Sequence, residues 1–110
     1  MYPKEEIIKH FRQTIKELYG DRLAKIVLYG SYARGDFHEE WDMDFLVVLK
    51  DEEISVSKEL KRMNKAVLDL MLKFNLVISL VPTTLQRFQE EKNPFFFNVL
   101  EEGIEVGKMK

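Results

Sequence analysis

The stretch Leu28–Leu49, which reads LYGSYARGDFHEEWDMDFLVVL, decides the fold of this chain and contains most of its candidate functional residues. It begins inside a short apolar run, Lys25–Tyr29, that is typical of a buried strand. Gly30 and Ser31 then break the run as a strand-to-helix turn would. Glycine lets the backbone approach a ligand closely, and the free N–H groups of a following helical turn point at an anion. The pattern predicts a phosphate-binding turn, to which the Ser31 hydroxyl and the Arg34 guanidinium could add donors.

Two acids follow at the start of a second apolar segment, Met43–Leu49. Asp42 and Asp44 flank Met43, so on a strand both carboxylates project to the same face. Two neighbouring carboxylates repel each other, and a divalent cation bound between them removes that cost. Mg²⁺ held by one or two carboxylates and by substrate phosphates is the usual arrangement at phosphoryl-transfer sites. Taken alone, the Gly-Ser pair could be only a turn and the acids only a solvated strand entrance, but at this spacing they jointly predict a nucleotide and metal site.

These residues make the chain resemble the nucleotidyltransferases of the DNA polymerase β superfamily. The signature of that family is an apolar residue, Gly, then Gly or Ser, a spacer, and then acid, apolar, acid, apolar. It is met here by Tyr29–Ser31 and by Asp42–Phe45. The run Gly30–Asp36 looks more narrowly like the minimal nucleotidyltransferases of bacteria and archaea, and residues 93–103 are similar to the tail of such proteins.

The resemblance implies a role for each residue of the motif. Gly30 and Ser31 would hold the phosphates of an NTP, expected to be ATP, with Arg34 assisting them. Asp42 and Asp44 would be the catalytic residues and would bind Mg²⁺ or Mn²⁺.

Two positions depart from the family pattern. Trp41 stands where Ser often precedes the acid pair, and the segment Leu76–Val81, which matches the strand that holds a third carboxylate in the superfamily, contains no acid. Ser79 is the only polar residue inside that segment, so we expect it where the missing acid would lie. A hydroxyl can orient a metal-bound water but cannot replace a carboxylate as an anionic ligand or base. The loop before the acid pair could supply the lost group, with the candidates Asp36, His38, Glu39 and Glu40.

The favoured hypothesis is an enzyme that moves a nucleoside monophosphate from an NTP to a hydroxyl acceptor and releases pyrophosphate. Minimal nucleotidyltransferases often resemble the antitoxin half of a toxin–antitoxin pair whose partner is an all-helical HEPN ribonuclease, which implies a hydroxyl of such a partner as the acceptor. The alternative, favoured by the absent third carboxylate, is a non-catalytic module that binds nucleotide or partner and neutralises a HEPN-type toxin by contact. A third hypothesis is nucleotidylation of a small molecule, which normally needs an acceptor domain that this length does not supply.

Length and composition set further bounds. A chain of 110 residues, 45% hydrophobic and 33% charged, is expected to form a single domain over residues 1–110. The net charge of −2 gives no strong signal for nucleic-acid binding. The chain has no cysteine, and no apolar run long enough to cross a bilayer. We therefore expect a cytoplasmic protein without membrane contact, and homodimerisation stays open.

The hydrophobic periodicity predicts the elements outside the motif. These are helices over Met1–Tyr19 and Ser57–Phe74, a strand over Leu76–Val81 ending at Pro82, a short helix through Glu91 capped by Thr83 or Thr84, a final helix from Asn93 to Glu102 closed by Gly103 in the left-handed conformation, and a short edge strand within Ile104–Lys108. Because consecutive helical residues point about 100° apart, at least one of Phe95, Phe96 and Phe97 should cover another element or a partner. The expected fold is α/β (α+β), a small mixed sheet with helices mainly on one face, and the resemblance implies the polymerase β palm-like nucleotidyltransferase fold.

Overall fold

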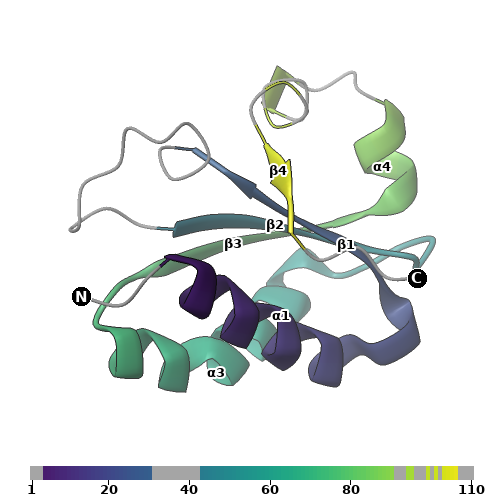
Figure 1. Cartoon of the computed structure of the whole chain (residues 1–110). Helices are drawn as coiled ribbons and strands as arrows, with labels where there is room; N and C mark the ends of the chain where they lie inside the picture. The colour runs from purple at the N-terminus through teal and green to yellow at the C-terminus, as the bar shows by residue number, and fades with distance from the viewer. Residues whose placement is uncertain are drawn as a thin grey trace.

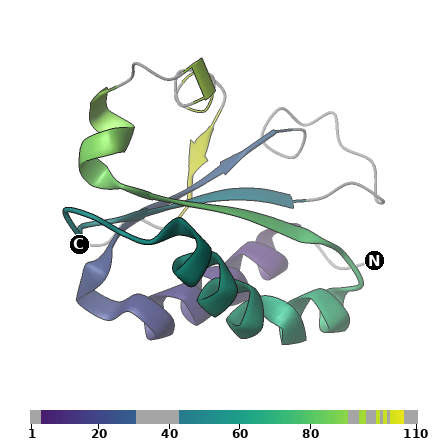
Figure 2. The same cartoon turned by 180° about the vertical axis from the view of Figure 1, so that it is seen from behind.

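The computed structural model describes residues 4–30, 43–90, 94, 95, 99, 101 and 103–106. Four strands form one sheet in the order β3-β2-β1-β4, with the bounds β1 Leu23–Tyr29, β2 Met43–Leu49, β3 Ile78–Thr84 and β4 Ile104–Glu105. The long helices α1 (Lys4–Tyr19) and α3 (Val56–Phe74) cover one face of the sheet, and the short helix α4 (Leu85–Glu90) lies on the other (Figure 1). Figure 2, seen from behind, has the same two layers of helices on opposite sides of the sheet.

The sheet is mixed, as the sequence predicts. β1 pairs antiparallel with β2 and with β4, while β2 pairs parallel with β3. Parallel neighbours need a long crossover, and α3 provides it between β2 and β3. This crossover sets β3 beside β2 with Asp44 opposite Ser79.

The alternation of side chains in β2 separates two cores. Phe45, Val47 and Leu49 point into the core under α1 and α3, where the Phe11 and Phe45 rings stack with their centroids 3.9 Å apart. Leu46 and Val48 point the other way, into a smaller cluster with residues such as Phe88 of α4. We call this second surface of the sheet, which also carries Asp44, the site face. Phe88 of α4 and Val99 cover the far part of the site face.

The predicted bounds of the third strand are wrong. Instead of running from Leu76 to Val81 and stopping at Pro82, the strand runs from Ile78 through Pro82 to Thr84. Proline lacks an N–H and is tolerated in a strand at the edge of a sheet, and β3 is an edge strand because it pairs only with β2. The cap prediction is confirmed for Thr84, whose hydroxyl accepts a hydrogen bond from the Arg87 N–H at 3.2 Å.

The prediction for Gly103 is also wrong. It does not adopt the predicted left-handed conformation, which the structure assigns instead to Gly20 and Asn75 after the two long helices. The reason for glycine at this position is close packing, since an added Cβ would lie 2.5 Å from Val27 Cγ1 and would also meet the Val99 carbonyl. A residue without a side chain thus lets the chain reach β1 and begin β4, the predicted edge strand.

A buried ionic cluster fixes the end of the sheet farthest from Asp44. Glu59 of α3 is only 5% exposed, and its carboxylate accepts a hydrogen bond from the Tyr19 hydroxyl at 2.9 Å and pairs with Arg22 at 3.2 Å. Arg22 also pairs with Asp51 at 3.1 Å. Burial and the bond to Glu59 raise the pKa of Tyr19. The cluster ties α1, α3 and the loop after β2 together, and sequence analysis missed it.

Candidate functional site

A row of three side chains crosses the sheet where β1 ends and β2 and β3 begin. Tyr29 of β1 is the direct cross-strand neighbour of Asp44, and Asp44 is the direct neighbour of Ser79 on β3. Paired residues of neighbouring strands point to the same face, so all three side chains lie together on the site face. Each of them is partly exposed, which leaves the row accessible from solvent.

Gly30 brings the turn after β1 against the Asp44 carboxylate. Its φ is +76°, a conformation that glycine adopts without strain. A Cβ at Gly30 would lie 2.6 Å from Asp44 Oδ2, closer than any real contact of this kind. Glycine is therefore required both by the turn and by the acid beside it, and the two halves of the sequence motif meet here.

The Tyr29 phenol stays protonated near neutral pH. Burial raises its pKa to about 12, and the negative charge of Asp44 adds to the effect. The ring of Tyr29 also contacts Phe95 edge-on, with centroids 5.4 Å apart and an angle of 88° between the planes. One of the three consecutive phenylalanines thus covers another element, as predicted.

The predicted site residues divide into two groups. Gly30 and Asp44 lie against each other, and Ser79 is next to Asp44. The predicted residues outside the described part of the chain are Ser31, Arg34 and Asp42, together with the loop candidates Asp36, His38, Glu39 and Glu40. Tyr29 and Phe95 were not singled out as functional, because nothing in the sequence spacing connects two aromatic residues so far apart.

The row suits a hard cation in its donor chemistry. A partly exposed carboxylate at Asp44 is the oxygen ligand that Mg²⁺ prefers, and the Ser79 hydroxyl could orient a metal-bound water. Within the described ranges no three acidic, histidine or cysteine side chains gather closely enough to form a metal site by themselves. The described part of the row therefore offers one carboxylate for a cation.

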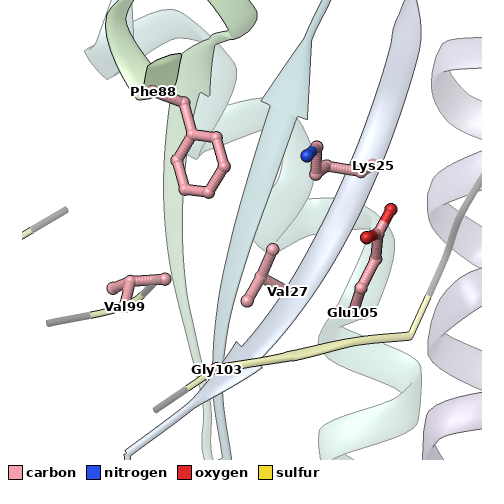
Figure 3. A pocket seen from close by; sticks show the side chains of 6 residues that line it. All are labelled: Lys25, Val27, Phe88, Val99, Gly103 and Glu105. Carbon is pink, nitrogen blue, oxygen red and sulfur yellow. The ribbon is translucent and has the colours of Figure 1, made fainter. Parts of the chain in front are cut away.

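A small hollow lies farther along the site face (Figure 3). It has a volume of about 140 Å³ and is lined by Lys25, Val27, Phe88, Val99, Gly103 and Glu105. The Lys25 ammonium sits 5.0 Å from the centre of the Phe88 ring. Pockets for drug-sized ligands measure roughly 300–1,000 Å³, so this hollow is too small for a nucleotide. The Tyr29, Asp44 and Ser79 row remains the better candidate.

Known proteins resemble this chain over most of its length. A family model for the nucleotidyltransferase domain matches residues 8–104. Two proteins of Methanocaldococcus jannaschii, each named "putative protein adenylyltransferase", are 38% and 37% identical to the chain over 101 residues, which are 91% and 92% of this chain and 94% and 96% of those proteins.

Solved structures share the fold. A toxin–antitoxin crystal structure with AMP-PNP matches with a TM-score of 0.59 at 20% identity, over 90% of this chain and 74% of that one. A structure described as a "putative minimal nucleotidyltransferase" matches with a TM-score of 0.59 at 19% identity, over 91% and 92% of the two chains. The predicted fold is confirmed. Among the described residues, no helix is both long enough and apolar enough to span a membrane.

Proposed function

The chain belongs to the nucleotidyltransferase domain family, and we propose that it transfers the adenylyl group of ATP to a hydroxyl and releases pyrophosphate. The observation that carries the proposal is the contact between Gly30 and Asp44, because it joins the glycine turn to a carboxylate on an accessible face. The relatives named as protein adenylyltransferases support ATP as the donor and a protein as the acceptor.

The roles of the site residues follow from their chemistry. Gly30 and Ser31 would bind the phosphates through backbone N–H and hydroxyl donors, with Arg34 assisting. Asp42 and Asp44 would hold Mg²⁺ or Mn²⁺, which when bound offsets the charge that develops on the transferring phosphoryl group. The neutral Tyr29 adds no second negative charge beside Asp44 at neutral pH.

We further propose that the acceptor hydroxyl belongs to a helical HEPN-type partner. The toxin–antitoxin structures that share this fold support a protein partner. The outer side of α3, across the sheet from Asp44, offers an apolar contact to another part of such a partner, because Leu68 and Leu72 are 51% and 73% exposed and lie one helical turn apart. Changing both leucines to Glu is expected to prevent a coexpressed HEPN-type partner from co-eluting with the chain.

A second candidate function is a non-catalytic module that neutralises its partner by contact. Ser79 favours it, since the direct neighbour of Asp44 on β3 is a hydroxyl instead of an acid. If Asp44→Ala abolishes adenylyl transfer but a partner toxin remains neutralised, contact and not transfer accounts for the biology.

The proposed reaction is tested by incubating the purified chain with each NTP and Mg²⁺ or Mn²⁺, with and without a HEPN-type partner. Pyrophosphate release and intact mass are the measurements. We expect a monophosphate adduct on the acceptor, its loss in Asp44→Asn, and its persistence in Asp69→Asn, which removes an exposed carboxylate of α3 instead. An adduct that survives Asp44→Asn, or no adduct with any nucleotide, would overturn the proposed reaction.

A further inference from the structure

Phe95 is an exposed aromatic residue beside the proposed reaction site. It is 37% exposed, which is unusual for a phenylalanine in a chain whose other described phenylalanines, Phe11, Phe45, Phe74 and Phe88, are all buried. Its ring is held edge-to-face against Tyr29 with centroids 5.4 Å apart. A partly exposed ring that is held against a neighbouring ring is what a stacking ligand requires.

The position of Phe95 relative to Asp44 follows from the sheet. Tyr29 and Asp44 are direct cross-strand neighbours, so their Cβ atoms are about 5 Å apart. The Asp44 charge contributes to the raised pKa of Tyr29, which agrees with a phenol that lies near the carboxylate. Phe95 contacts the Tyr29 ring, and Tyr29 is the direct neighbour of Asp44, so Tyr29 connects Phe95 to the acid. A nucleotide whose phosphates are at Asp44 could place its base there.

We propose that Phe95, backed by Tyr29, binds the nucleobase of the NTP by stacking. The inference rests on the proposed function, because it needs the triphosphate at Gly30 and Asp44. Every base has a π face, and aromatic side chains in nucleic-acid-binding proteins stack on bases without reading their hydrogen-bonding edges. The site would therefore prefer large purine rings to small pyrimidine rings through contact area, with little distinction between adenine and guanine.

Tyr29 serves as the rigid support in this arrangement. It belongs to β1, which pairs with strands on both sides, whereas Phe95 comes from the C-terminal part of the chain. Edge-to-face contacts between aromatic rings stabilise a defined orientation, so Tyr29 limits the positions that the Phe95 ring adopts before a base arrives. Tyr29→Phe keeps this ring contact and should leave base binding nearly unchanged.

The test compares two ligands that share phosphates and differ in the base. Calorimetry measures binding of ATP and of inorganic tripolyphosphate, each with Mg²⁺, to the full chain and to its Phe95→Leu, Phe95→Trp and Leu72→Ala variants. Phe95→Leu keeps an apolar side chain but removes the ring, and Leu72→Ala is a control at an exposed apolar residue of α3 on the other side of the sheet.

We expect Phe95→Leu to weaken ATP binding roughly tenfold and to leave tripolyphosphate binding unchanged. Phe95→Trp should retain ATP affinity, and the preference for ATP over CTP in the unchanged chain should shrink in Phe95→Leu. Equal losses for ATP and tripolyphosphate would mean that Phe95 only supports the fold, and unchanged ATP binding would mean that the base lies elsewhere. Both results overturn the inference about Phe95 but do not contradict the proposed function, adenylyl transfer. A chain that binds neither ligand overturns the proposed function together with the inference.

Discussion

Replacing Gly30 by Ala tests the contact on which the site is built, and the chain contains a matched control. Gly20 and Gly30 both have positive φ, +55° and +76°. A Cβ at Gly20 meets nothing within 4 Å, whereas a Cβ at Gly30 would lie 2.6 Å from Asp44 Oδ2. Gly20→Ala thus isolates the conformational cost, and Gly30→Ala adds the collision.

The magnitudes follow from these two terms. The left-handed conformation costs a non-glycine residue roughly 1–2 kcal/mol, partly offset by about 0.4–1 kcal/mol because alanine restricts the unfolded chain. We therefore expect Gly20→Ala to lower the free energy of unfolding by about 1 kcal/mol. Overpacking adds about 1–3 kcal/mol, so Gly30→Ala should lower it by roughly 2–4 kcal/mol.

A double-mutant cycle measured by urea denaturation separates the cost of the collision with Asp44 from the conformational cost of alanine at position 30. Asp44→Ala removes Oδ2 and leaves its Cβ at 3.6 Å from the added methyl group, which is ordinary contact. In that background Gly30→Ala should cost no more than Gly20→Ala, giving a coupling energy of about 1–3 kcal/mol between positions 30 and 44. A coupling energy below about 0.5 kcal/mol would refute the reasoning that Gly30 is required by Asp44. Adenylyl transfer should fall in Gly30→Ala and persist in Gly20→Ala.

Three further predictions concern other residues. Ser79→Asp should raise the Mg²⁺ affinity of the chain several-fold and destabilise the metal-free fold, as measured by denaturation with and without Mg²⁺, because it sets a further carboxylate directly beside Asp44. The pKa of Tyr29 is about 12 in the folded chain, above its ordinary value of 10.0, so its contribution to stability is complete below pH 10 and is lost as the pH rises toward 12. Tyrosinate absorbance, with Tyr29→Phe as the reference, should reveal a lower Tyr29 pKa in Asp44→Asn. Tyr19→Phe should lower the free energy of unfolding by about 1–3 kcal/mol in urea denaturation, since it removes a hydrogen bond to the buried Glu59 carboxylate, with no effect on the affinity for tripolyphosphate.

The local features of the fold could be predicted from the sequence because they depend on periodicity. Alternation along Met43–Leu49 placed Asp44 on the face opposite Phe45, and Ser79, singled out as the only polar residue inside Leu76–Val81, lies directly beside Asp44. Pro82 was misread because strand position is not a local property. A proline ends a central strand but is accepted at an edge, and only the order of strands in the sheet reveals that β3 is an edge.

Contacts between distant parts of the chain could not be predicted. Glu59 follows Tyr19 by forty residues and occupies the first turn of a helix, where an acid is also expected for the helix dipole alone. Gly103 has an equally local explanation, a helix end, although the structure requires glycine there because Val27 is so close. The sequence indicated that at least one of the three consecutive phenylalanines covers another element, because all three cannot face one core. It did not indicate that Phe95 contacts Tyr29, because Tyr29 was considered only as part of the glycine motif.

The two direct neighbours of Asp44 allow its carboxylate to stay negatively charged without a bound cation. Ser79 on one side and the protonated Tyr29 on the other are both neutral near pH 7, so neither repels the carboxylate. A carboxylate at position 79 would repel Asp44 until a cation bound, so the stability of the fold would depend on the metal. With serine there, the fold needs no cation at that position, and the attraction for the cation is weaker by the same physics. Metal and nucleotide should therefore bind cooperatively in this chain, because the phosphates supply the negative charge that position 79 lacks.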